Sequence, residues 1–140
     1  MMVLFKRYHI WPMHRGIKTY TRRFWKKPHV KVGTWYPVTH KMMYQPEDVV
    51  GEIYIEDLYR QSLGMMTEQD AYAEGGYTLA GYKRTLELIS KKPWDDCAVL
   101  CVVKFQFVLS DIIDGNGGTV EIDEYRRLYD EHMKIVQACV

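Results

Sequence analysis

The stretch Gly16-Ile17-Lys18-Thr19-Tyr20-Thr21-Arg22-Arg23 is the part of the sequence that decides the fold. Because β-branched and aromatic residues favour strands, its Thr19-Tyr20-Thr21 segment predicts a strand. A glycine after an amphipathic run is typical of a helix end, so Gly16 predicts the end of a short helix. The stretch is therefore expected to form a helix-to-strand turn with Lys18 at the start of the strand.

The faces of this strand set a geometric condition for any site built on it. Side chains alternate between the two faces of a strand, so Thr21 and Arg23 share one face. On a regular strand, Lys18 would point to the opposite face from Thr21. Lys18 can share a pocket with Thr21 only if it lies in the turn that precedes the strand.

The residues before this stretch predict a strand and a helix, and the residues after it form a basic, aromatic segment. Val3-Leu4-Phe5-Lys6 predicts a first strand, and Tyr8 to Arg15 predicts a short helix with Pro12 in its first turn. The following segment, Phe24 to Lys31, is basic and aromatic. One interpretation is phosphate contacts combined with base stacking on Phe24 or Trp25. The other is a solvated loop whose aromatic side chains pack into the core.

Three further segments predict strands. Residues 32–38 form a short apolar run, and residues 50–57 alternate, with Ile53 and Ile55 on one face and Glu52, Tyr54 and Glu56 on the other. Residues 97–109 are the most apolar run and predict a buried strand. Cys97 and Cys101 are expected on one face of it as small core residues.

Capping residues and apolar spacing predict three more helices. Thr67 is a suitable N-cap for a helix that ends at Gly75, and a second helix runs from Thr78 to Ser90 with Leu79, Tyr82, Leu86 and Ile89 on one stripe. A third ends near Gln137, with the stripe Tyr125, Leu128, His132 and Ile135. The turn at residues 114–119 resembles a calcium-binding loop, but its ligand positions fall on Ile113 and Gly115, so we reject that interpretation.

Length and composition indicate one globular domain. The chain has 140 residues and an ordinary apolar content, and no apolar run approaches the roughly 18 residues that a membrane span needs. It lacks a secretory signal pattern. Its three cysteines have no framework spacing, which favours a reducing compartment. We therefore expect a cytoplasmic location without membrane contact.

Charge is unevenly distributed along the chain. Residues 1–46 carry ten Lys or Arg and no Asp or Glu, whereas the remaining residues carry nine Lys or Arg and all 18 Asp and Glu. Such asymmetry predicts an anionic partner, for which RNA, a nucleoside or a nucleotide is the natural candidate. The alternative is that the acidic part folds back and neutralises the basic part.

Two motifs resemble the signatures of one family. Gly16, Lys18, Thr21 and Arg23 resemble the G-x-K-x-x-[E/T]-x-R signature of the ASCH domain family in the PUA-like superfamily. Residues 63–79 resemble its second signature, in which a helix ends in Glu-Gly before another helix. Thr21, where many members carry glutamate, is similar to the branch containing the bacterial N4-acetylcytidine amidohydrolases.

The resemblance implies a fold and a domain organisation. It predicts an α+β protein, a small PUA-like mixed β-barrel with flanking helices, over residues 1–109. Residues 110–140 fall outside the resemblance. They are expected to form a turn and a helical extension that packs on the barrel or on a second subunit.

The resemblance also implies a catalytic group of Lys18, Thr21 and Glu74. A threonine hydroxyl is a weak nucleophile that needs a base, and a lysine with a lowered pKa is suited to that role. Glu74 would move protons, backbone N–H groups near Gly16 would hold the oxyanion, and Arg23 would orient a phosphate or carboxylate. The alternatives to a catalytic role for Glu74 are a structural ion pair with Lys18 or Arg23 and an exposed position near the helix end. Because a negative charge there opposes the dipole, its placement indicates that Glu74 has a partner.

Two functions are therefore compared. The first is binding of RNA or a modified nucleobase in a basic cleft lined by Gly16, Arg22, Arg23, Trp25, Lys26 and Lys27. The second is hydrolysis of N4-acetylcytidine or a similar N-acylated base. A buried, convergent catalytic group would favour the enzyme, whereas an open basic groove would favour RNA binding. The family also suggests a metal-dependent ribonuclease, but no Asp or Glu precedes Glu47, so neither a metal nor a cofactor is expected.

Overall fold

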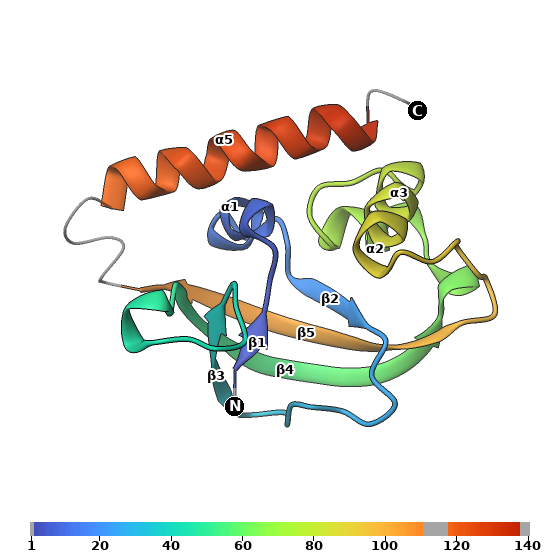
Figure 1. Ribbon diagram of the computed structural model, residues 1–140. Helices are drawn as coiled ribbons and strands as arrows, with labels where there is room; N and C mark the ends of the chain where they lie inside the picture. The colour runs from blue at the N-terminus through green and yellow to red at the C-terminus, as the bar shows by residue number, and fades with distance from the viewer. Residues whose placement is uncertain (1, 111–117, 138–140) are drawn as a thin grey trace.

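The structure, a computed structural model, describes residues 2–110 and 118–137. Its centre is one five-stranded sheet with the strand order β1-β3-β4-β5-β2 (Figure 1). The pair β1/β3 is parallel and the other neighbours are antiparallel. The strands are β1 (Val3–Leu4), β2 (Tyr20–Arg23), β3 (Trp35–Thr39), β4 (Gly51–Ser62) and β5 (Val99–Leu109).

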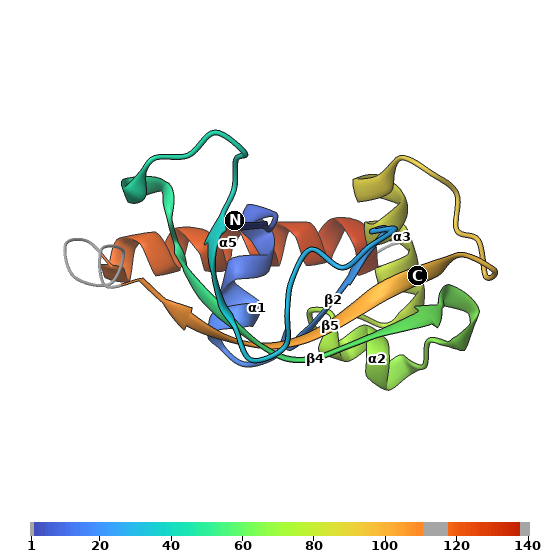
Figure 2. The ribbon, with the colours of Figure 1, turned by 90° about the horizontal axis from the view of Figure 1, so that it is seen from below.

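The two long strands β4 and β5 give the sheet its curvature. They run side by side from the pair Gly51–Leu109 to the pair Ser62–Val99, with a register shift between Ile55 and Asp57 (Figures 1 and 2). Such an irregularity bends and twists a strand locally. The sheet therefore forms a half-barrel, and together with the helices it confirms the predicted α+β fold class.

The helices lie on the inner side of this sheet (Figure 1). Thr67 accepts a hydrogen bond from Asp70 N at 3.1 Å, which confirms the predicted N-cap. Thr78, where the second helix was expected to start, is the N-cap of that helix and accepts a hydrogen bond from Gly81 N at 3.1 Å. The helical elements are η1 (Arg7–His9), α1 (Ile10–His14), η2 (Pro46–Asp48), η3 (Leu63–Met65), α2 (Glu68–Ala73), α3 (Leu79–Ser90) and α5 (Gly118–Gln137).

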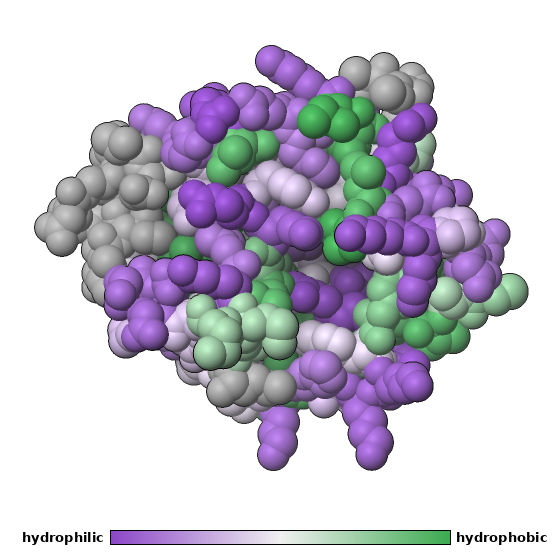
Figure 3. Space-filling model, in the orientation of Figure 1, coloured by the Kyte–Doolittle hydropathy of each residue, from purple (hydrophilic) through white to green (hydrophobic). Residues whose placement is uncertain are grey.

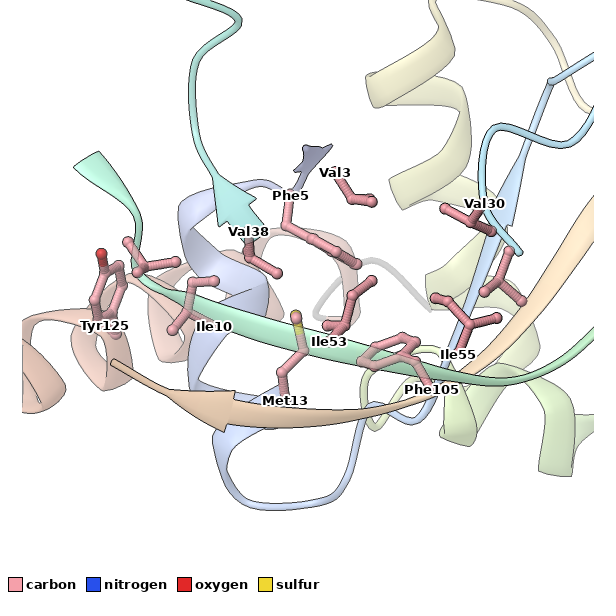
Figure 4. Close-up of a cluster of buried hydrophobic side chains, with 12 residues drawn as sticks. Val3, Phe5, Ile10, Met13, Val30, Val38, Ile53, Ile55, Phe105 and Tyr125 are labelled. Atoms are coloured by element: carbon pink, nitrogen blue, oxygen red, sulfur yellow. The ribbon is translucent and has the colours of Figure 1, made fainter. Parts of the chain in front are cut away.

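The main core fills the space between α1 and the inner face of the sheet. Figure 4 shows Ile10 and Met13 from α1 with Ile53, Ile55 and Phe105 from β4 and β5. All five side chains are buried. For Ile53 and Ile55, this agrees with the alternation of apolar and polar residues along the strand. A second cluster joins α2, α3 and α5 and contains the buried side chains Tyr77, Tyr82, Leu100 and Val136.

Helix α5 packs on η1, α1 and α3, so that α1 lies between α5 and the sheet (Figures 1 and 2). Tyr125 and His132 are buried as predicted. Ile135 is 65% exposed, and Val136 is buried instead, because it lies four residues after His132 on the same helix face. Most of the predicted turn at residues 114–119 lies outside the described residues.

Two other expectations about burial were wrong. Cys97 precedes β5 and is exposed, since its N–H donates to the Asp95 carboxylate in a turn; only Cys101 is a buried strand residue. Ile89 is 39% exposed at the end of the α3 stripe. No helix in residues 2–110 and 118–137 is long and apolar enough to cross a membrane.

Candidate functional site

The position of Lys18 follows from how α1 ends. Gly16 adopts a φ of +72°, which favours glycine, and reverses the chain after the helix. The N–H groups of Ile17 and Lys18 both donate to the carbonyl oxygen of Pro12, at 2.8 and 2.9 Å. Lys18 therefore lies in the turn before β2, as sharing a pocket with Thr21 requires.

A backbone hydrogen bond joins this turn to the end of α2. Thr19 N donates to Ala73 O at 2.9 Å, which brings Lys18 beside Glu74. The chain then turns through Gly76, whose φ is +83°. A Cβ atom at Gly76 would lie 2.6 Å from the hydroxyl oxygen of Tyr129, so the close approach of α5 also requires glycine.

Glu74 lies at the centre of a buried charge cluster. The Lys18 ammonium donates to Glu74 O at 2.7 Å and to Tyr20 O at 2.9 Å, and it lies 3.4 Å from Glu74 Oε1. Arg22 Nη1 donates to Glu74 Oε2 at 2.9 Å, and Arg22 Nη2 donates to Gln61 Oε1 at 2.8 Å. Glu74 thus has the partner that its position predicted, but the arginine is Arg22 rather than Arg23.

Thr21 and Arg23 lie on the same face of β2, as predicted. Arg23 Nε donates to Thr21 Oγ1 at 2.9 Å. The Arg23 guanidinium lies 4.7 Å from the centre of the Phe5 ring and 5.8 Å from the centre of the Trp25 ring. Cation–π contacts therefore fix the guanidinium against the core while Nε holds the Thr21 hydroxyl.

The cluster changes the acidity of its cations. Burial lowers the pKa of Lys18 to about 8, and although the Glu74 carboxylate opposes this shift, the charges of Arg23 and Arg22 add to it. Burial likewise lowers the pKa of Arg23 to about 10. A substantial fraction of Lys18 is therefore uncharged at mildly alkaline pH, which is the condition for acting as a base.

These side chains line one pocket with a volume of about 290 Å³. In the orientation of Figure 1, the surface is hollowed near its centre and hydrophilic atoms form the bottom of the hollow (Figure 3). The wall brings together β1, η1, the turn before β2, β2, the end of β3, the end of α2, and α3. Its residues are Leu4, Phe5, Lys6, His9, Lys18, Thr21, Arg22, Arg23, His40, Glu74, Tyr82, Thr85, Leu86 and Ile89.

The three predicted catalytic residues lie in one pocket, whereas the residues predicted to line a basic groove do not all lie together. Lys18, Thr21 and Glu74 are each at most 5% exposed and line the same pocket. Lys26 and Lys27 are exposed away from that wall. Trp25 is half-buried and stacks on His29 with ring centres 4.5 Å apart.

The expectation that backbone N–H groups near Gly16 hold an oxyanion is wrong. Gly16 N donates to Met13 O at 3.2 Å, and the following N–H groups donate to Pro12 and Ala73. These donors are used by the turn itself, and Gly16 does not line the pocket. These N–H groups are therefore not available to an oxyanion in the pocket.

Sequence reasoning did not assign several pocket residues. His9, His40, Tyr82 and Thr85 come from three separate segments: η1, the residue after β3, and α3. Only a buried polar side chain on an apolar face, such as Thr85 in α3, gives a signal. His14 is exposed and takes no part in the wall. In the part of the chain that the structure describes, no group of three or more His, Cys, Asp or Glu is placed to hold a metal ion.

The curved sheet, the helix-to-strand turn and the paired helices α2 and α3 together define an ASCH-like fold. The chain is similar to an ASCH domain from Lactobacillus crispatus JV V101, with 17% identity, a TM-score of 0.54, and coverage of 69% of this chain and 67% of that one. It is also similar to a point mutant of ZmASCH from Zymomonas mobilis, with 12% identity, a TM-score of 0.50, and coverage of 81% and 77%.

A DUF984 protein from Enterococcus faecalis V583 aligns with a TM-score of 0.47 and 16% identity over 68% of this chain and 63% of that one. No model of a protein family matches the sequence, and no curated protein matches it either. The similarity therefore lies in the fold, as the two sequence motifs predicted.

Proposed function

We propose that the protein is an amidohydrolase that removes the acyl group from an N-acylated nucleobase, with N4-acetylcytidine as the representative substrate. The observation that supports this most is the convergence of Lys18, Thr21 and Glu74, all buried, around one pocket. A volume of about 290 Å³ suits a single base better than a stretch of polynucleotide.

The reaction begins with the neutral amine of Lys18. Loss of its proton frees a lone pair, and the longest of its contacts, 3.4 Å to Glu74 Oε1, is the one most easily given up. The amine takes the Thr21 hydroxyl proton as Oγ1 attacks the acyl carbonyl carbon. The C–N bond then breaks, and Lys18 returns the proton to the leaving nitrogen.

A water molecule completes the cycle. With Lys18 again as base, water attacks the acyl-threonine ester, releases a carboxylic acid and restores the Thr21 hydroxyl. The Glu74 carboxylate stabilises the ammonium form of Lys18 between these steps. Its second oxygen is held by Arg22, which fixes the carboxylate in place.

Arg23 supports the nucleophile. By donating to Thr21 Oγ1, Arg23 Nε stabilises negative charge that develops on that oxygen. Because this oxygen accepts from Arg23, the hydroxyl hydrogen of Thr21 points away from Arg23 and is free to go to a base. Among the described residues, the Arg23 Nη groups have no hydrogen-bond acceptor, so they are available to a carbonyl oxygen or a carboxylate product.

The test is chromatographic separation of cytidine from N4-acetylcytidine after incubation with purified protein. We expect turnover by the wild type and by Lys26→Ala, which removes an exposed lysine of the same basic segment. We expect none by Lys18→Met or Thr21→Val. Circular dichroism checks that each variant is folded. A folded wild type without turnover would exclude this substrate.

A second candidate is RNA binding, favoured by the exposed Lys26 and Lys27 beside the stacked Trp25 and His29. Phosphate contacts release counterions, so RNA affinity would fall with salt, and Lys26→Ala/Lys27→Ala would reduce that slope. Lys134→Ala in α5 is the control, since it removes an exposed lysine from another face. A flat response of affinity to salt would exclude this function.

A further inference from the structure

His9 belongs to both the pocket wall and a buried chain of polar groups. Its Nε2 lies 2.7 Å from the Tyr77 hydroxyl oxygen, which lies 2.8 Å from His132 Nε2 in α5. His132 Nε2 also lies 3.2 Å from Thr85 Oγ1, and Thr85 donates to Gly81 O at 3.1 Å. The chain therefore runs from the pocket to the C-terminal helix.

One assignment of hydrogens makes each of these contacts a hydrogen bond, with the single hydrogen on His132 Nε2 shared between Tyr77 and Thr85. Because Thr85 donates to Gly81 O, its oxygen accepts from His132, so His132 carries a hydrogen on Nε2. Tyr77 then accepts from His132, and its own hydrogen goes to His9 Nε2. His9 is consequently the tautomer with its hydrogen on Nδ1. No described residue outside this chain bonds that nitrogen.

We propose that His9 presents Nδ1–H to the pocket and donates a hydrogen bond to the carbonyl oxygen of the bound amide. The identity of the acceptor rests on the proposed function, whereas the tautomer and its exposure to a ligand rest on the hydrogen bonds alone. His9 would be a substrate-contacting residue, and Tyr77 and His132 would be positioning residues.

Such a donor suits the chemistry of the pocket. The backbone N–H groups around Gly16 already bond carbonyl oxygens of α1 and α2, so side-chain donors such as His9 and Arg23 are the candidates to hold a developing oxyanion. Burial, together with the nearby Lys18 charge, lowers the pKa of His9, which keeps the ring neutral. A neutral imidazole can polarise a carbonyl group without giving up its proton.

The supporting groups are held rigidly. Tyr8 stacks on His132 with ring centres 3.7 Å apart, and Tyr77 is 2% exposed. Burial lowers the pKa of His132 to about 4, so His132 also stays neutral. A fixed, uncharged chain behind His9 sets one ring orientation, which is what a preorganised donor needs.

His40 offers a contrast within the same wall. Its Nδ1 lies 3.0 Å from Phe5 O, and its Nε2 lies 3.0 Å from the Tyr125 hydroxyl oxygen. Both ring nitrogens are therefore occupied by the protein. Of the two histidines that line the pocket, His9 is the one with a nitrogen left for a ligand.

Two substitutions separate the two nitrogens of His9. His9→Asn places an amide N–H near the position of Nδ1, whereas His9→Gln places one near Nε2, where it contacts Tyr77. We expect kcat for N4-acetylcytidine to fall by about 100-fold in His9→Gln, as for loss of one oxyanion donor, and to be largely kept in His9→Asn. Equal losses in the two folded variants, or the reverse order, would overturn the proposal.

Long-range ¹H–¹⁵N spectra of the histidine rings test, independently of turnover, which nitrogen of His9 carries the hydrogen and whether that nitrogen contacts a ligand. We expect the His9 hydrogen on Nδ1 in the free protein, and a shift of that nitrogen at saturating N4-acetylcytidine or cytidine. The His40 ring serves as the internal control and should keep its signals. A His9 hydrogen on Nε2, or an unchanged His9 ring in the saturated protein, would refute the proposal. Absence of turnover alone would refute only the proposed function.

Discussion

Lys18 Nζ donates to the main-chain oxygen of Glu74 at 2.7 Å, although the two residues are 56 positions apart. The ammonium is thus anchored to the backbone at the end of α2 as well as to the carboxylate. The main-chain contact does not depend on the side chain at position 74, so substitutions there change the charge of the pocket while leaving the anchor of Lys18 in place.

The rate of amide hydrolysis should rise with pH. Lys18 acts only when uncharged, and its pKa is lowered to about 8, so it is largely protonated at pH 6 and largely neutral at pH 9. We expect kcat/KM to increase through this range, to reach half of its plateau near the Lys18 pKa of about 8, and to level off only about one pH unit higher. Initial rates with N4-acetylcytidine in buffers of constant ionic strength would measure it. A profile that is flat from pH 6 to 9 would contradict the role of Lys18 as base.

Glu74→Gln should destabilise the fold. The substitution leaves Lys18 as a buried cation without a countercharge and leaves Arg22 with only Asp70, whose carboxylate lies 3.9 Å away. Removal of one member of a buried ion pair costs about 3–5 kcal/mol. Urea unfolding of the wild type, of Glu74→Gln, of Arg22→Met and of the double variant would measure the coupling. Since the double variant removes one of the two cations, it should be less destabilised than the sum of the single variants. If the losses of unfolding free energy in the two single variants simply add up in the double variant, the ion pair between Glu74 and Arg22 is contradicted.

His132 should make stability fall at acid pH. The folded-state pKa of about 4 lies below the model-peptide value of 6.5, so between those values the unfolded state binds more protons. The free energy of unfolding should therefore decline as pH falls through that window, because protonation of His132 is disfavoured in the folded state. His9, whose pKa burial also lowers, adds a loss in the same direction.

Comparison of variants isolates the contribution of His132. Urea unfolding between pH 7 and 4 should show a smaller decline for His132→Gln than for the wild type. His14→Gln, which removes an exposed histidine from α1, should keep the full decline. If His132→Gln and the wild type lose stability in parallel, the buried neutral state of His132 is wrong.

Thr21 should be required for turnover but not for folding. Thr21→Val keeps the shape of the side chain and removes the acceptor of the Arg23 Nε hydrogen bond, which contributes about 1 kcal/mol or slightly more because the donor is charged. Turnover should vanish in Thr21→Val and be partly kept in Thr21→Ser. Mass spectrometry of Thr21→Ser and of the wild type during turnover would look for the added acyl mass. Full activity of Thr21→Val would exclude threonine as nucleophile.

Gly76→Ala should disturb the contact between α5 and the pocket region. A Cβ atom there would lie 2.6 Å from the Tyr129 hydroxyl oxygen, and the φ of +83° disfavours alanine by about 1–2 kcal/mol. Thermal unfolding should show the loss. Adding Tyr129→Phe should recover only the part due to the clash, because the backbone strain remains. No loss in Gly76→Ala would contradict the close packing.

The sequence predicted most of the helices and strands, and it named Lys18, Thr21 and Glu74 as candidate residues, which line one pocket. Residue spacing predicted the end of α1 at Gly16, the N-cap Thr67, the start of α3 at Thr78, and the shared face of Thr21 and Arg23. These features depend on neighbours within a few residues. The two motifs indicated the fold. The partner of Glu74 was expected to be Lys18 or Arg23, and one of these two was correct.

Only the tertiary structure decided which distant groups meet. Arg22, rather than Arg23, pairs with Glu74 because β2 presents it toward the end of α2, while Arg23 turns toward Phe5. The backbone N–H groups near Gly16 are occupied by carbonyls of α1 and α2. Hydrogen bonds between segments dozens of residues apart leave no periodic trace in a sequence. The sequence therefore determined the local structure and the candidate catalytic residues, whereas the fold determined the partner of each charge.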